Sequence, residues 1–323
     1  MSEHHTNLPV IMVAFNRPAK VRQVLEVVRS VRPPVVVLIT DGPRPGRQAD
    51  VDNCREVRRV LESIDWPCEI LRNHADANLG CGRRIATGLS WAFEAVPRAV
   101  VLEDDILPHP SFFRYCEELL DRYADDERIM MISGANVLGQ WKPERHSYHF
   151  SYYGGIHGWA SWRRAWTHFD PSISRWKDPD VRQRLKDILV DGRQYAYRAS
   201  LYDQICDGND LGTWDYQWGF ARLVQSGLSI VPSVNLVRNI GFDASATHTR
   251  GVWTPACDRP VAAIDFPLRH PDYLMVDREF DNRMFRSLQP NWRCRWKGRL
   301  RACLGTGHRS LLKRIKTRAA RAT

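Results

Sequence analysis

Three consecutive carboxylates, Glu103-Asp104-Asp105, directly follow an apolar segment, Ala99 to Leu102, and precede a second one that begins at Ile106. This setting predicts that at least one carboxylate is partly buried. Burying several like charges together is costly unless a cation or a hydrogen-bond donor compensates for them. Mg²⁺ or Mn²⁺ prefers oxygen ligands, and one or two carboxylates hold such an ion when phosphate oxygens and water complete its coordination. The sequence therefore favours a metal-diphosphate site, and a structural ion pair with a nearby arginine is the alternative.

Residue type alone does not identify such a site, because a second acidic triplet, Asp125-Asp126-Glu127, has a similar composition. This second triplet lies between a predicted helix and a predicted strand, where a solvated loop is expected. The first triplet differs because it comes directly after a predicted buried strand. We therefore place the candidate chemistry at residues 103–105.

The first 133 residues alternate short apolar segments with segments whose apolar side chains recur at helical spacing. Strands are predicted at 10–14, 35–40, 68–71, 99–102 and 129–132, with helices after Pro18 and at about 57–64, 81–96 and 110–123. This order predicts a Rossmann-like α/β fold with a mostly parallel, mixed sheet flanked by helices. Asn16, Asp41, Asn73 and the first acidic triplet each follow a predicted strand. We expect these residues along one rim of the sheet, where such folds bind ligands.

Two common phosphate-binding sequences are missing: no GxGxxG follows the first predicted strand, and no GxxxxGK[ST] occurs anywhere. Their absence counts against a dinucleotide dehydrogenase and a P-loop enzyme. Arg83 and Arg84 instead open a predicted helix, where guanidinium groups and backbone amides are suited to bind phosphate. A solvated helix end is the equally weighted alternative for these two arginines.

Eight of the twelve tryptophans lie between Trp141 and Trp253. Their rings suit the apolar faces of sugars and also suit a protein core, and core packing is favoured by numbers alone. Asp215, in the segment Trp214-Asp215-Tyr216-Gln217-Trp218, is either a proton acceptor or a residue that stabilises a helix N-terminus. His248 is a lone histidine in a polar segment, which is typical of a surface residue.

The segment from Glu103 to Phe113, EDDILPHPSFF, resembles the acidic motif of nucleotide-sugar glycosyltransferases with the GT-A fold. The similarity is greatest to the inverting N-acetylglucosaminyltransferase I type and to bacterial family 2-like enzymes. Four other segments match in order: AFNRP at 14–18, TDG at 40–42, GIHGW at 155–159 and WDYQW at 214–218. The match covers roughly residues 8–250, and this ordered set is more specific than any single segment.

The resemblance implies a divalent ion, Mn²⁺ or Mg²⁺, and a set of contacts with a nucleoside diphosphate-sugar donor. By this resemblance, Arg17 and Asp41 lie against the nucleotide base. Glu103 faces the donor sugar, Asp104 faces the ribose, and Asp105 binds the metal.

The resemblance also implies that Asp215 is the catalytic base, which accepts a proton while the acceptor hydroxyl attacks the anomeric carbon in one inverting displacement. His248 resembles the histidine that completes the metal or diphosphate site in many GT-A enzymes. Two positions depart from the family, because its second acid after the base is Tyr216 here and its nucleotide-contacting histidine is Arg84. These departures bear on which nucleotide base and which sugar the donor carries more than on the type of reaction.

The first functional hypothesis is an inverting, metal-dependent glycosyltransferase. It moves a sugar from a nucleoside diphosphate donor, UDP-linked by resemblance, to a hydroxyl of a glycan or lipid-linked acceptor. The second hypothesis is a nucleotidyltransferase that makes nucleotide sugars, which we expect to carry a glycine-rich, basic loop after the first strand, unlike Phe15-Asn16-Arg17-Pro18. The third is a non-catalytic carbohydrate-binding protein.

The formal net charge of +10 comes from the C-terminal residues. Residues 293–323 contain eleven of the 47 Lys and Arg and no acid, so 36 basic and 37 acidic side chains remain in residues 1–292. A neutral body argues against nucleic acid as a partner, because the basic surface of a nucleic-acid enzyme normally covers its working face. Residues 292–323 are either a solvated tail or a segment that binds an anionic membrane surface.

We predict three parts in the chain: a nucleotide-sugar-binding subdomain at 8–133, an aromatic-rich acceptor and catalytic subdomain of the same domain at 134–250, and a C-terminal appendage with the basic tail at 251–323. No segment has the roughly eighteen apolar residues of a membrane span, and residues 1–8 lack the apolar core of a signal peptide. We expect a cytoplasmic protein, peripheral on the inner face of the membrane if the tail binds lipid.

Overall fold

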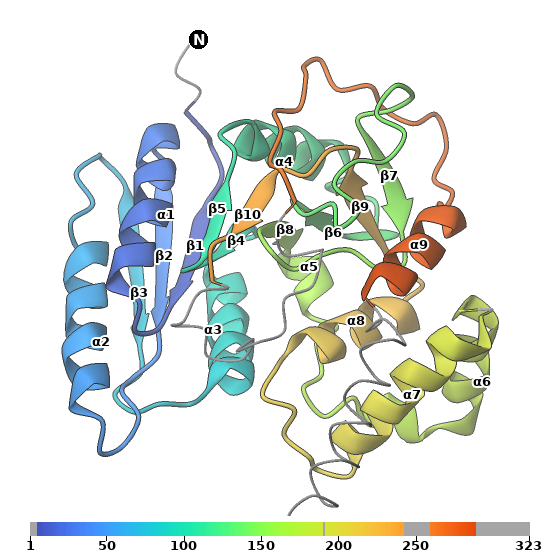
Figure 1. Cartoon of the computed structure of the whole chain (residues 1–323), viewed down its shortest axis with the longest axis horizontal. Helices are drawn as coiled ribbons and strands as arrows, with labels where there is room; N and C mark the ends of the chain where they lie inside the picture. Colours follow the sequence, from blue (N-terminus) through green and yellow to red (C-terminus); the bar gives the residue numbers. More distant parts are fainter. Residues whose placement is uncertain (1–4, 190, 242–258, 289–323) are drawn as a thin grey trace, which may run out of the picture.

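The computed structural model describes residues 5–189, 191–241 and 259–288. Its central sheet contains β1 (Val10–Ala14), β2 (Val35–Thr40), β3 (Glu69–His74), β4 (Arg98–Glu103), β6 (Ile129–Ser133), β7 (Tyr148–Ser151), β8 (Trp159–Trp162) and β9 (Leu228–Pro232). Their spatial order is β3-β2-β1-β4-β8-β6-β9-β7, and only β8 and β7 run opposite to the other strands (Figure 1). The predicted fold class, an α/β fold with a mostly parallel, mixed sheet, is confirmed.

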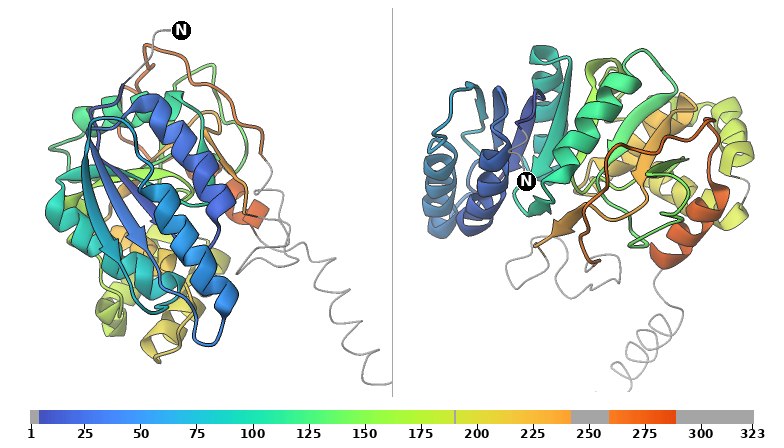
Figure 2. Two further views of the ribbon diagram at one scale, coloured as in Figure 1. Left: turned by 90° about the vertical axis from the view of Figure 1, so that its left-hand side faces the viewer. Right: turned by 90° about the horizontal axis from the view of Figure 1, so that it is seen from above.

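Successive residues of β1 face opposite sides of the sheet, as the two-residue period of a strand requires. Val10 and Met12 pack into one core cluster, with α1 (Pro18–Val31), α2 (Gln48–Leu61) and α4 (Ser111–Arg122). Ile11 and Val13 pack into a second cluster, with α3 (Cys81–Ala95), α5 (Arg163–Trp166) and α8 (Asp215–Val224). Helices therefore cover both faces of the sheet, and Figure 2 shows α1 and α2 side by side over the first strands.

A third core cluster lies at the end of the molecule opposite α2 (Figure 2). It is built largely from η1 (Ser174–Lys177), α6 (Pro179–Leu189), α7 (Gly192–Cys206) and α9 (Arg278–Leu288). The large side chains of Trp176, Tyr202 and Phe280 are fully buried in this cluster. Residues 259–288 belong to the predicted C-terminal appendage, yet Ile264 and Leu268 pack into the first core cluster.

The tryptophan-rich middle region contributes to the protein core, which is the role that the number of its tryptophans favoured. Trp159, Trp166, Trp214 and Trp218 are all buried in the second cluster. The rings of Trp159 and Trp214 stack with their centroids 5.5 Å apart and an interplanar angle of 28°. These rings fix the position of the chain immediately before α8, whereas Trp253 lies outside the described residues.

Helix α2 starts nine residues earlier than the sequence predicts, at Gln48 instead of about residue 57. Its buried face consists of Asp50, Cys54, Val57, Val60 and Leu61. The first of these residues is an aspartate, so a search for apolar periodicity does not recognise the first turns of the helix.

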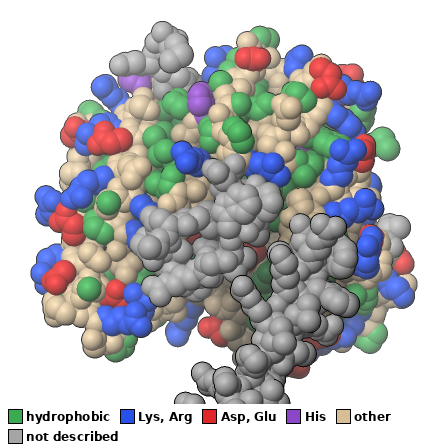
Figure 3. Space-filling model, in the orientation of Figure 1, with side chains coloured by type: hydrophobic (Ala, Val, Ile, Leu, Met, Phe, Trp, Pro, Cys, Tyr) green, Lys and Arg blue, Asp and Glu red, His purple; other side chains and the backbone are tan. Residues whose placement is uncertain are grey.

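The surface seen in Figure 3 carries Lys and Arg side chains among Asp and Glu side chains, in keeping with the balanced charge of residues 1–292. Within the described part of the chain, no helix is both long and apolar enough to cross a bilayer.

Candidate functional site

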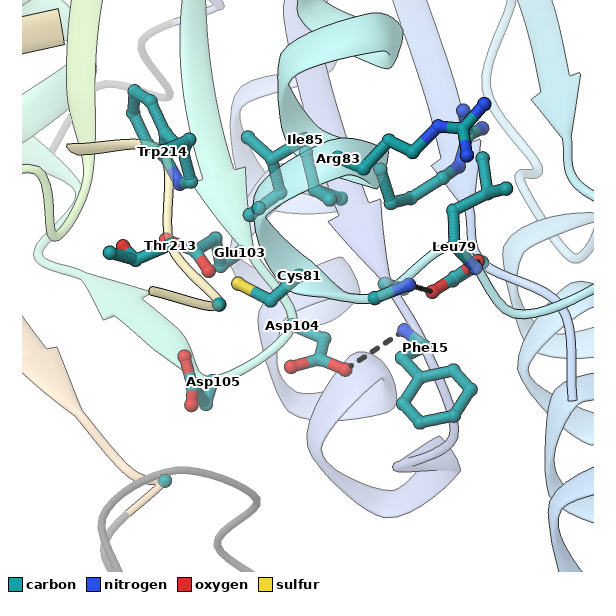
Figure 4. Close-up of a pocket in the computed structure, with 18 of the residues that line it drawn as sticks. Phe15, Leu79, Cys81, Arg83, Ile85, Glu103, Asp104, Asp105, Thr213 and Trp214 are labelled. Carbon is teal, nitrogen blue, oxygen red and sulfur yellow. Dashed lines mark hydrogen bonds between the residues drawn. The ribbon is translucent and has the colours of Figure 1, made fainter. Parts of the chain in front are cut away.

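A cavity of about 450 Å³ opens where β1, β2 and β4 end. The first turn of α3, the residues before α8, the last residue of β10 (Val237–Asn239) and Gly241 complete its walls (Figure 4). Seven predicted site residues line this cavity: Arg17, Asp41, Arg83, Arg84, Glu103, Asp104 and Asp105. Asp41 and the acidic triplet of the predicted rim thus meet in one cavity, whereas Asn16 and Asn73 are not part of its lining and instead bind Asp50 and Arg84. The contacts of the lining residues with a ligand stay predictions.

Two of the three adjoining carboxylates, Asp104 and Asp105, share one guanidinium group. Arg17 Nη1 donates to Asp105 Oδ2 at 2.8 Å, and Arg17 Nη2 donates to Asp104 Oδ1. The other oxygen of Asp104 accepts the backbone N–H of Phe15 at 3.2 Å, a contact drawn in Figure 4. The ion pair that the sequence left open as an alternative is thus present in the structure.

One guanidinium group does not offset the negative charge of this cluster. Burial, together with the nearby carboxylates of Asp105 and Asp104, raises the pKa of Glu103 to about 8. Burial also raises the pKa of Asp104, although Arg17 opposes this effect. A second cation close to these side chains would stabilise their charged forms.

The donor atoms of the cluster fit a divalent ion only if other ligands complete its coordination. In residues 5–189, 191–241 and 259–288, no three His, Cys, Asp or Glu side chains form a group able to hold a metal. Asp105 keeps one oxygen, Oδ1, for which the described residues supply no hydrogen-bond partner. A hard ion held by one or two carboxylates and completed by phosphate oxygens and water therefore fits. The predicted ligand His248 lies outside the described residues.

The carboxylate of Asp41 organises the loop that leads into α3. Its Oδ1 accepts the backbone N–H groups of Gly42 and Leu79, each at 2.9 Å. Its Oδ2 accepts from Gly80 N at 3.1 Å and from Asn78 Nδ2 at 2.8 Å. These four bonds give Asp41 a structural task in addition to the predicted contact with a nucleotide base.

The two arginines at the start of α3 have different surroundings. Arg84 is buried, with Nε donating to the carbonyl oxygen of Thr40 at 3.0 Å and Nη2 donating to the side-chain oxygen of Asn73 at 2.8 Å. It thus connects the ends of β2 and β3. Arg83 is exposed at the cavity, and none of the ion pairs within the described part of the chain includes it. Arg83 is therefore the better placed of the two for an anionic ligand.

Asp215 is the first residue of α8 and directly follows two cavity-lining residues, Thr213 and Trp214. Its Oδ1 accepts a hydrogen bond from Thr213 Oγ1, and no side chain caps the helix. Asp215 is near enough to Glu103 to add to the rise of its pKa. The predicted base thus lies at the edge of the cavity that contains the acidic triplet.

Several cavity residues escaped the sequence analysis. His157 lines the cavity, and burial lowers its pKa while Asp105 and Asp215 raise it. Its segment, GIHGW, matched the family in order, and that position was the only available signal for a role. Cys81 projects among the acidic side chains in Figure 4. Nothing in the spacing around Cys81 or Gly241 indicated a site.

No protein family model matches the chain. No curated protein matches it either.

Solved structures of similar shape match at low sequence identity. A mannosyltransferase from Pyrobaculum calidifontis, PcManGT, in complex with GDP-Man and Mn²⁺ is 14% identical over 49% of this chain and 45% of its own, with a TM-score of 0.34. A UDP-glucose pyrophosphorylase in complex with UDP-glucose is 9% identical over 71% of this chain and 91% of its own, with a TM-score of 0.35. An inositol-1-phosphate CTP transferase from T. maritima is 11% identical over 77% of this chain and 99% of its own, with a TM-score of 0.34. The chain thus spans less than half of the mannosyltransferase, and these values assign it to none of the three families.

Proposed function

We propose that the protein is an inverting, metal-dependent glycosyltransferase. It transfers one sugar from a nucleoside diphosphate-sugar, UDP-linked by the resemblance of the sequence, to a hydroxyl of a glycan or lipid-linked acceptor. The observation that carries the proposal is one cavity in which three carboxylates, an exposed arginine and a helix N-terminus meet beside Asp215. In such a cavity a divalent ion pairs with the carboxylates, and the anionic donor pairs with the arginine and the helix N-terminus.

Each part of the cavity has a task in this reaction. Arg83 and the first-turn amides of α3 bind the diphosphate, because a helix N-terminus and a guanidinium group both favour phosphate. Glu103 faces the donor sugar, and Asp104 faces the ribose. Asp105 would hold a divalent ion, which would stabilise the charge that develops on the departing diphosphate.

Asp215 accepts the proton of the acceptor hydroxyl as that oxygen forms its bond to the anomeric carbon. The hydrogen bond from Thr213 Oγ1 orients the carboxylate, and the buried Trp214 fixes the backbone before it. A single displacement from the face opposite the diphosphate inverts the anomeric centre.

The connection between β1 and α1 supports sugar transfer over nucleotidyl transfer. It consists of Phe15, Asn16 and Arg17, and α1 begins at Pro18 without a glycine-rich loop. Incubation with nucleoside triphosphate and sugar phosphate separates the two reactions, because a nucleotidyltransferase releases pyrophosphate from this mixture. A glycosyltransferase instead releases nucleoside diphosphate from a nucleotide sugar.

The primary experiment screens nucleotide sugars for thermal stabilisation with and without Mn²⁺, since a ligand of the native state raises apparent stability by mass action. The best donor is then used with Asp215→Asn. We expect transfer to fall by about 10³-fold while donor binding persists, because only the proton acceptor is lost. Asp207→Asn, an exposed change at the end of α7, is the matched control. Unchanged turnover in Asp215→Asn would contradict the mechanism.

We further propose that residues 134–250 bind the acceptor and that residues 292–323 hold the protein on an anionic membrane surface. The second proposal is supported by eleven basic residues and no acid after residue 292. Removing the chain after about residue 291 should release the protein from anionic vesicles without abolishing donor hydrolysis. Equal sedimentation of both forms with vesicles would reject it.

A further inference from the structure

The geometry points to Arg17 as an internal counter-cation that a divalent ion displaces from Asp105, while Asp104 keeps its bond to Arg17. This inference rests on the proposed function and adds a sequence of events to it. Without a ligand, Arg17 binds the carboxylate that a metal requires. With metal and diphosphate present, one end of the same guanidinium group is released toward the phosphate oxygens.

The starting arrangement is a bridge between the ends of two neighbouring strands. Arg17 follows β1, and Asp104 and Asp105 follow β4. The two terminal nitrogens of Arg17 bind different carboxylates, and the Arg17 side chain is only 18% exposed. A guanidinium group is suited to such a bridge because its nitrogens donate from fixed positions in one plane.

The two carboxylates differ in how firmly they are held. Asp104 is 2% exposed in its side chain, and both of its oxygens are occupied, by Arg17 and by the backbone N–H of Phe15. Asp105 is 14% exposed, and only its Oδ2 has a side-chain partner within the described residues. An incoming ion therefore competes with Arg17 for the charge of Asp105, because Asp105 is the more exposed of the two carboxylates and has one oxygen without a hydrogen-bond partner within the described residues.

The release of Arg17 from Asp105 links metal binding to donor binding. A metal that binds alone at Oδ1 of Asp105 is repelled by the guanidinium group at Oδ2 and has to weaken that ion pair, so its affinity without a nucleotide is weak. A diphosphate changes this balance because it supplies oxygens both to the ion and to the released end of Arg17. We therefore expect the nucleotide and the metal to bind with positive coupling that depends on Arg17.

The test measures Mn²⁺ binding directly, from the electron paramagnetic resonance signal of the free ion, in full-length protein without any sugar donor. We expect Arg17→Ala to bind Mn²⁺ about ten-fold more tightly than the wild type in the absence of nucleotide, because the competing charge is gone. Arg83→Ala is the matched control: it removes the same charge from the same cavity but breaks no ion pair of the described residues, and its affinity for Mn²⁺ should change by less than about two-fold.

UDP supplies the second half of the test. In the wild type UDP should tighten Mn²⁺ binding by about ten-fold or more, and in Arg17→Ala this gain should be much smaller. Arg17→Lys keeps the charge but cannot bridge two carboxylates from one plane, so its affinity for Mn²⁺ should lie between the other two. This variant also serves as the test if Arg17→Ala does not fold.

The outcomes separate this inference from the proposed function. Equal or weaker Mn²⁺ binding by Arg17→Ala and Arg17→Lys, together with Mn²⁺-dependent transfer by the wild type, overturns the counter-cation and leaves the glycosyltransferase in place. No Mn²⁺ binding by any variant, with or without UDP, contradicts the metal-dependent function itself. Thermal unfolding in EDTA adds an independent readout, since Arg17→Ala should lose stability that Mn²⁺ restores.

Discussion

The backbone N–H of Ile240 donates to the carbonyl oxygen of Asp105 at 2.8 Å. This bond fastens the chain after β10 to the acidic end of β4, next to the antiparallel pairing of β10 with β5 (Ile106–Pro108). The next residue, Gly241, then lies against the Asp105 carboxylate. A Cβ atom at position 241 would be only 2.0 Å from Asp105 Oδ2, so this position accepts glycine alone without movement of the acid.

Gly241→Ala should therefore displace the Asp105 carboxylate while the fold persists. We expect weaker Mn²⁺ binding and a loss of turnover of up to about 100-fold, because small displacements of reacting groups have effects of this size. Titration with Mn²⁺ and the rate of nucleoside diphosphate release measure the two effects. Gly192→Ala, at the start of α7, is the control, since a Cβ there meets nothing within 4 Å. Equal metal affinity in both variants would show that Asp105 does not bind the ion.

The four hydrogen bonds accepted by Asp41 predict a loss of both stability and donor affinity in Asp41→Asn. An amide group places a donor where the carboxylate accepts N–H groups, so at least one of the N–H groups of Gly42, Leu79 and Gly80 loses its partner. The free energy of unfolding should fall by about 1–3 kcal/mol. Urea unfolding and donor titration provide the measurements.

Asp76→Asn is the matched control for this change, because Asp76 is exposed on the same loop and no hydrogen bond to its carboxylate is found within the described residues. Its stability should stay within about 0.5 kcal/mol of the wild type. If Asp41→Asn keeps its stability but loses donor affinity, Asp41 acts through the nucleotide and not through the loop.

The sequence predicts the part of the fold in which apolar strands alternate with helices of regular apolar spacing. Strands β1, β2, β4 and β6 match predicted segments closely because each is an apolar run between helices. The insertion of β8 between β4 and β6 was not predicted, since it depends on pairings such as Val100 with Ala160, sixty residues away. Local periodicity contains no information about such long-range pairing.

The candidate site was predictable in its location and less so in its connections. Residues that follow parallel strands meet at one edge of a sheet, which brought Asp41 and the triplet at 103–105 together. The sequence left open an ion pair between the triplet and a nearby arginine, but it did not identify Arg17 as that residue or predict the bonds of Arg84, because a long side chain reaches many partners. The sequence predicts a turn at 239–242 that faces the crevice but not the contact of Gly241 with Asp105, because that contact depends on the atom opposite the glycine in space.

The stacked pair Trp159 and Trp214 predicts that the core beneath α8 also supports the site. Trp214 is 2% exposed, so Trp214→Ala should lower the free energy of unfolding by about 3–5 kcal/mol. Because Asp215 follows it directly, turnover should also fall in the fraction of protein that stays folded. Tyr273→Ala is the control, since Tyr273 is 55% exposed and its loss should cost less than about 1 kcal/mol. Equal stability of the two variants in urea would contradict this role of Trp214.

The buried carboxylate of Asp50 in α2 predicts a pH-dependent contribution to stability that is separate from the cavity cluster. Hydrogen bonds from Arg44 lower the pKa of Asp50 to about 2 from its ordinary value of 3.8, and Asn16 Nδ2 donates a further bond at 2.7 Å. Because the folded protein favours the charged form, this contribution is fully present above about pH 4. It is lost as the pH falls through 2.

Asp50→Asn should accordingly be less stable than the wild type by about 2 kcal/mol at pH 7, and this difference should shrink as the pH approaches 2. Urea unfolding of both proteins between pH 7 and pH 2 measures it, with Asp52→Asn as the control because Asp52 is exposed on the same helix. If the difference in stability stays constant over this range, the charge of Asp50 does not contribute to stability. Asp50 would then act through its shape and hydrogen bonds alone, because a contribution from its charged interaction with Arg44 has to disappear when the carboxylate is protonated.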